Sequence, residues 1–80
     1  MPQKIKLIWD FYGLTSTKTA KHHEIHLKQY ILAQKLLISI TGFEIKNEVH
    51  CIAFMVVTAN NMIQVRDTLK PHRAEVYELK

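Results

Sequence analysis

Histidines are the residues of this sequence whose type and spacing most directly suggest chemistry. Five occur in 80 residues, and His22 and His26 are spaced four apart. On a helix this spacing places two imidazoles on one face, and a zinc or copper ion accepts such a pair together with one or two further ligands. Candidates for the further ligands are His50, Cys51 and His72. In this interpretation the metal site consists of His22, His26 and His50.

Basic residues around the same histidines suggest an anion site instead. A helix N-terminus carries partial positive charge and favours acidic residues, yet the segment reaches its first acid only at Glu24. A bound phosphate or carboxylate would resolve this conflict, held by backbone N–H groups and by cationic side chains. The predicted ligand-binding residues are Lys18, Lys21, His22, His26, His72 and Arg73.

A third interpretation is acid/base catalysis centred on His23. This residue lies on the predicted buried face of its helix, near the strand that carries Asp10 and Tyr12. A partly buried imidazole beside a carboxylate can titrate near neutrality and move a proton. The catalytic set would be His23 with Asp10 and Tyr12, while Cys51 is expected to be a small buried side chain. The plainest alternative is that the histidines are ordinary surface and core-edge residues.

Six elements must position these residues. A period-two alternation of apolar and polar side chains over 4–11 predicts a strand that ends at Gly13. Thr15, Ser16 and Thr17 offer helix caps, and good helix formers follow. A phase slip at Gly42 indicates a bulge in the second strand. The remaining ranges are a helix over 18–37, strands over 38–46 and 50–57 joined by a turn at 46–48, a short helix ending before Pro71, and a strand over 74–79.

The order β-α-β-β-α-β is that of the ferredoxin-like fold. We therefore expect a single α+β domain over 1–80, with a four-stranded antiparallel sheet in the order 4-1-3-2 and both helices on one face. In this topology all five histidines lie toward the same end of the domain. The prediction is a pocket rich in histidine and lysine at that end of the sheet.

Composition and charge exclude several classes of protein. The chain is 48% hydrophobic and 22% charged, values that are ordinary for a globular domain and not for a disordered one. It has no apolar run near the roughly 20 residues of a membrane span, and a signal peptide is not expected. A single cysteine fits a reducing compartment, so a cytoplasmic location is expected. The formal charge of +4 comes from scattered residues, so nucleic-acid binding is not expected.

Two apolar surfaces predict a homodimer. The sheet face away from the helices carries Ile8 and one half of the third strand, and both halves of that strand are apolar. A second stripe on the back of the first helix consists of Ile25, Leu32 and Leu36. Exposed patches of this kind mark interfaces, and burying them would support a small core.

Residues 20–27 (AKHHEIHL) and 40–44 (ITGFE) resemble the dimeric α+β barrel superfamily, in particular its small monooxygenase-like and ether-degradation-protein-like members. The resemblance implies two ferredoxin-like sheets packed face to face in a homodimer, and a cofactor-free enzyme that uses a histidine of the first helix, His23 or His26. The chain is also similar to short uncharacterised bacterial proteins, a resemblance that implies no activity. The leading prediction is a homodimeric domain that binds a small anionic ligand, with no cofactor; zinc or copper is the alternative.

Overall fold

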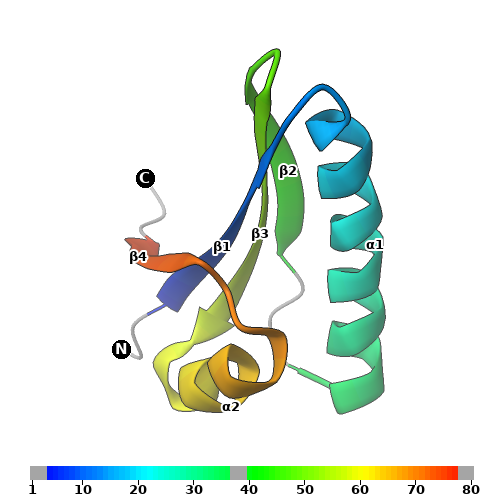
Figure 1. Ribbon diagram of the computed structural model, residues 1–80. Coiled ribbons are helices and arrows are strands. Elements are labelled where there is room, and N and C mark those ends of the chain that lie inside the picture. The colour runs from blue at the N-terminus through cyan, green and yellow to red at the C-terminus, as the bar shows by residue number, and fades with distance from the viewer. Residues whose placement is uncertain (1–3, 37–39, 78–80) are drawn as a thin grey trace.

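The computed structural model describes residues 4–36 and 40–77. Its elements follow the predicted order and pack as one layer of strands and one layer of helices (Figure 1). They are β1 (Lys4–Tyr12), α1 (Ser16–Gln34), β2 (Thr41–Asn47), β3 (His50–Thr58), α2 (Ala59–Leu69) and β4 (Arg73–Tyr77). Neither described helix is long and apolar enough to cross a membrane.

The four strands form one antiparallel sheet in the order β2-β3-β1-β4. This is the predicted order 4-1-3-2 counted from the opposite edge. The two central strands, β1 and β3, pair along their full length from Lys4 opposite Thr58 to Tyr12 opposite His50. This register decides which side chains share a face, because successive residues of a strand point to opposite sides.

The core lies between the sheet and the two helices. It combines odd-numbered residues of both central strands with one side of each helix, which places α1 and α2 on the same face of the sheet. Trp9 also joins the layers through a hydrogen bond, since its indole N–H donates to the carbonyl of Leu69 at the end of α2 over 3.0 Å. The buried members are Leu7, Trp9, Leu27, Ile31, Ala53, Met55, Val57 and Val65.

The opposite face of the sheet does not expose the apolar centre that the sequence suggested. The half of β3 on this face is Ile52, Phe54 and Val56, yet Ile8, Ile52 and Val56 are each at most 1% exposed. Their cross-strand neighbours are long or charged: Arg73 and Phe54 flank Ile8, Asp10 and Glu44 flank Ile52, and Lys6 lies opposite Val56. Stems of such side chains cover apolar surface while their heads stay solvated.

The second predicted apolar stripe is exposed only in part. Ile25 and Leu32 on the back of α1 are 53% and 78% exposed, as expected. Leu36 instead packs against the core. The reason is the end of the helix: Lys35 adopts a left-handed conformation (φ 53°), which turns the chain back toward the sheet.

Several predicted boundaries shift. The helix begins at Ser16 and ends at Gln34 instead of spanning 18–37, and residues 37–39, part of both the predicted helix and the predicted second strand, lie outside the described residues. Gly42 is not a bulge, because it pairs regularly with Phe54; the irregularity falls between Ile45 and Asn47, beside the turn. The last strand is Arg73–Tyr77, and 78–80 lie outside the described part of the chain.

Candidate functional site

An open hollow of about 540 Å³ lies along one side of α1. Residues three and four apart share one side of a helix, which explains why a single segment lines it. None of the described lining residues is acidic. The lining consists of Lys18, Thr19, His22, His23 and His26.

His22 and His26 form a close pair at the mouth of this hollow. Their Nε2 atoms lie 3.0 Å apart, and the ring centroids are 4.7 Å apart with an angle of 70° between the planes. Both side chains are exposed. When both rings are neutral, one Nε2–H donates to the lone pair of the other; when both are protonated, the two N–H groups repel each other. The contact therefore requires one ring to donate its Nε2–H and the other to accept it.

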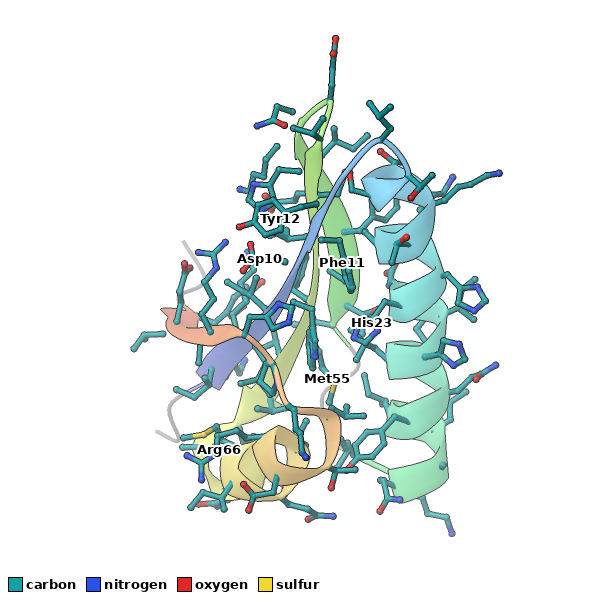
Figure 2. All side chains as sticks on the ribbon, in the orientation of Figure 1. Asp10, Phe11, Tyr12, His23, Met55 and Arg66 are labelled. Carbon is teal, nitrogen blue, oxygen red and sulfur yellow. The ribbon has the colours of Figure 1, made fainter. Side chains whose placement is uncertain are left out.

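His23 points the opposite way, into the core. Figure 2 shows it between the sheet and α1, on the same side as Phe11 and Met55. Its ring lies 5.0 Å from that of Trp9 and 5.3 Å from that of Phe11. Its Nε2 atom is buried and has no hydrogen-bond partner among the described residues. Burial lowers the pKa of His23, and the charges of His26 and His72 lower it further. His23 is accordingly a neutral imidazole at neutral pH.

The first turn of α1 lacks side-chain caps. Thr15 occupies the N-cap position without a capping hydrogen bond, and the first turn contains no acid. The hydroxyls of Ser16 and Thr17 instead contact the buried thiol of Cys51, at 3.4 and 3.2 Å. Cys51 is fully buried, as the sequence predicted for a small apolar side chain. Lys21 does not line the hollow; its ammonium group lies 5.8 Å from the ring of Phe43 on β2.

A second polar cluster lies on the other face of the sheet. Asp10 accepts two hydrogen bonds from Arg73, at 3.0 and 3.1 Å, and a third from Nε2 of His50 at 2.8 Å. The His50 ring stacks on Tyr12, with a centroid distance of 4.5 Å and an interplanar angle of 9°. The bonds from Arg73, and secondarily from His50, hold the pKa of the Asp10 carboxyl below its usual range against the opposing effect of burial.

The sheet therefore separates the predicted site residues into two groups. Lys18, His22, His23 and His26 lie on the α1 side, and Asp10, Tyr12, His50 and Arg73 cluster on the other face. His72 lies at the boundary, where its backbone N–H donates to the Ile8 carbonyl and its Nδ1 accepts the backbone N–H of Asp10.

Two of the predicted combinations are not brought together. His23 does not meet Asp10 or Tyr12, which Figure 2 shows pointing away from α1. His22 and His26 do not meet His50, and the described part of the chain contains no group of three or more His, Cys, Asp or Glu residues placed to hold a metal ion. The contact of Asp10 with His50 and Arg73 was not predicted. Its sequence signal is the strand register, since Asp10 and His50 share a face once β1 and β3 are aligned.

Comparison with known proteins adds no relative. No protein family model, no curated protein and no solved structure matches this chain. Its α+β architecture and its two polar clusters are therefore the basis on which its function must be argued.

Proposed function

We propose that this chain is a binding domain for a small anionic ligand, which it holds in the hollow on α1. The observation that carries the proposal is the lining: one lysine and three histidines line the hollow, and none of the described lining residues is acidic. A phosphate or carboxylate placed there would gain charge-assisted hydrogen bonds without like-charge repulsion.

Three side chains are available for the ligand. The ammonium group of Lys18 supplies positive charge, and the exposed rings of His22 and His26 would exchange their mutual hydrogen bond for contacts with the anion.

The other predicted contacts receive less support. Arg73 already uses its guanidinium group on Asp10 and Glu75. Lys21 lies toward Phe43, and His72 is engaged with the backbone of Asp10. The proposed site thus reduces from six residues to Lys18, His22 and His26.

The ferredoxin-like classification and the homodimer belong to the same proposal. Support for the classification comes from the element order, the strand order and the two helices on one face. Support for the dimer comes from the exposure of Ile25 and Leu32 on the back of α1, since the opposite sheet face is closed by its own charged side chains. A contact through α1 would differ from the face-to-face sheets that the resemblance implies. Sedimentation at micromolar concentration tests it: a monomer of 9.4 kDa would contradict the dimer.

The anion site is tested by NMR titration of backbone amides and histidine rings with inorganic phosphate and citrate. All solutions are first freed of metal ions with a chelating resin, and the measurements are made at pH 7.5. We expect saturable shifts confined to residues 18–26. Lys18→Gln should weaken binding, whereas Lys28→Gln, on the same helix but outside the hollow, should not. The proposal fails if these residues do not shift, or if both lysine variants weaken binding equally.

A further inference from the structure

The histidine pair in the hollow has a geometry that suits a second kind of ligand. His22 and His26 come from consecutive turns of α1 and present their Nε2 atoms to each other at 3.0 Å, with both rings exposed to solvent. The N–H···N bond that joins them holds a proton where a metal ion with vacant coordination positions could sit. Imidazole nitrogen is a preferred ligand of the first-row transition metals.

The separation of the two nitrogens indicates which coordination geometry they fit. At metal–nitrogen distances of about 2.0–2.1 Å, two nitrogens 3.0 Å apart subtend an angle of about 95° at the metal. That angle matches neighbouring positions of a square-planar or octahedral complex. A tetrahedral site would separate the nitrogens by about 3.3–3.4 Å at the same bond length. Square-planar and tetragonal geometry is typical of Cu(II) and Ni(II), and Cu(II) binds nitrogen ligands most tightly of the divalent series.

The geometry points to His22 and His26 as a two-histidine chelate for a Cu(II)-class ion, independent of His50. The neighbouring residues determine how many coordination positions of the metal stay open. No third His, Cys, Asp or Glu joins the pair among residues 4–36 and 40–77, so the remaining positions go to water or to a small external ligand. The hydroxyl of Thr19 is already bonded to the Thr15 carbonyl, and Lys18 adds positive charge to the hollow. The chelate is accordingly an open site with exchangeable positions.

This inference does not depend on the proposed anion binding, although both use the same hollow. The metal titration is made without phosphate or carboxylates, and the anion titration is made in metal-free solutions. Either proposal can therefore fail while the other stands.

The test is a titration of the intact chain with Cu(II) in a non-coordinating buffer at pH 7.5, followed by calorimetry and by paramagnetic line broadening. Substoichiometric copper should broaden the ring signals of His22 and His26 before those of His50 and His72. A change in the second shell of a metal site alone costs about 10–100-fold in affinity, so His26→Asn, which removes a direct ligand, should weaken binding at least about tenfold.

A matched control separates chelation from the mere presence of histidines. His26→Asn combined with Gln29→His keeps the number of histidines on α1 but destroys the four-residue spacing, and Gln29 is exposed. The inference predicts that this double variant binds copper as weakly as His26→Asn alone. It is overturned if the double variant binds as tightly as the original chain, or if His50 and His72 broaden as early as His22 and His26.

Discussion

Arg73 holds the carboxylate of Asp10 from the neighbouring edge strand, with Nε donating to Oδ2 at 3.0 Å and Nη2 donating to Oδ1 at 3.1 Å. Bidentate pairs of this kind are the more specific form of ion pair. Because Asp10 also accepts a hydrogen bond from His50, its carboxylate links β4, β1 and β3 at one level of the sheet. The edge strand β4 is largely exposed, so this contact fastens an element that has little buried surface of its own.

Asp10→Asn should therefore destabilise the domain. The amide keeps the shape of the side chain but loses the charge that Arg73 and His50 face, which we expect to cost about 1–2 kcal/mol of unfolding free energy. Urea denaturation at pH 7 measures the loss. Asp67→Asn is the control, because its carboxylate makes a single exposed contact with the adjacent Arg66. Equal effects of the two substitutions would contradict a structural role for Asp10.

The lowered pKa of the same carboxyl group predicts that the free energy of unfolding decreases at acidic pH. Its folded pKa lies below the ordinary value of 3.8, so its contribution is complete above that value and is lost as the pH falls through the folded pKa. Asp10→Asn removes this group from the titration. The difference in unfolding free energy between the original chain and Asp10→Asn should be constant from pH 7 to pH 5 and should shrink below pH 4. A difference that persists unchanged at pH 2 would refute the assignment.

A side chain at Gly42 is predicted to collide with the ring of Phe54. A Cβ atom at this position would lie 2.6 Å from Cζ and 2.8 Å from Cε2 of the Phe54 ring, and the ammonium group of Lys6 lies 4.4 Å from the centroid of the same ring. Gly42→Ala must displace that ring, and we expect a loss of about 1–2 kcal/mol in unfolding free energy. In a Phe54→Ala background the same substitution should cost much less. Additive effects in this double-mutant cycle would rule out the contact.

The sequence predicts the helices and strands well, but it predicts only in part which of their residues point into the core. Alternation over 4–11 placed Leu7 and Trp9 in the core, because a strand beside helices has one buried face. In β3 both halves are apolar, so periodicity could not choose between them, and the facing of Ile52 followed only from the register with β1. Gly42 shows the same limit. Because it has no side chain, it leaves room for the ring of Phe54 on the neighbouring strand, and the sequence of one strand alone does not reveal that contact.

In the candidate site, contacts between residues close in the sequence could be predicted, whereas most contacts between different elements could not. The contact of His22 with His26 follows from helix geometry alone, and it is present. The separation of His23 from Asp10 and Tyr12 could have been expected, because the alternation over 4–11 places the even-numbered residues of β1 on the face away from the core. The closed face of the sheet was missed because the sequence does not show how far the stems of Lys6 and Arg73 extend over their apolar neighbours.

Trp9→Phe should loosen the end of α2 more than the rest of the molecule. The substitution retains most of the buried ring but removes the hydrogen bond from the indole N–H to the Leu69 carbonyl, at a cost of about 1–2 kcal/mol in unfolding free energy. Amide hydrogen exchange should accelerate in 65–70 beyond the global change. Phe11→Leu, which alters an aromatic side chain of the same strand that has no hydrogen bond to α2, should accelerate exchange evenly. If exchange in Trp9→Phe accelerated evenly along the chain, the hydrogen bond from Trp9 would have no specific role in holding the end of α2.

His23→Met should leave the domain as stable as before or more stable. The buried Nε2 of His23 has no hydrogen-bond partner in the described structure and lies among aromatic rings. No hydrogen bond therefore offsets the free-energy cost of removing this atom from water. An unpaired buried polar group costs about 1–3 kcal/mol, and a methionine of similar size removes that cost. Urea denaturation at pH 7.5 measures the change. A loss of more than about 1 kcal/mol would mean that His23 makes a stabilising polar contact after all.

The pH dependence of the same variant gives an independent test. Because burial lowers the pKa of His23 below 6.5, the unfolded chain takes up a proton at a higher pH than the folded chain does. The folded state therefore loses stability as the pH falls through 6.5, and the loss is complete below the folded pKa. His26 and His72, whose charges oppose protonation of His23, remain in the variant. His23→Met should flatten the decline between pH 7 and pH 5, and an unchanged slope would show that another group titrates there.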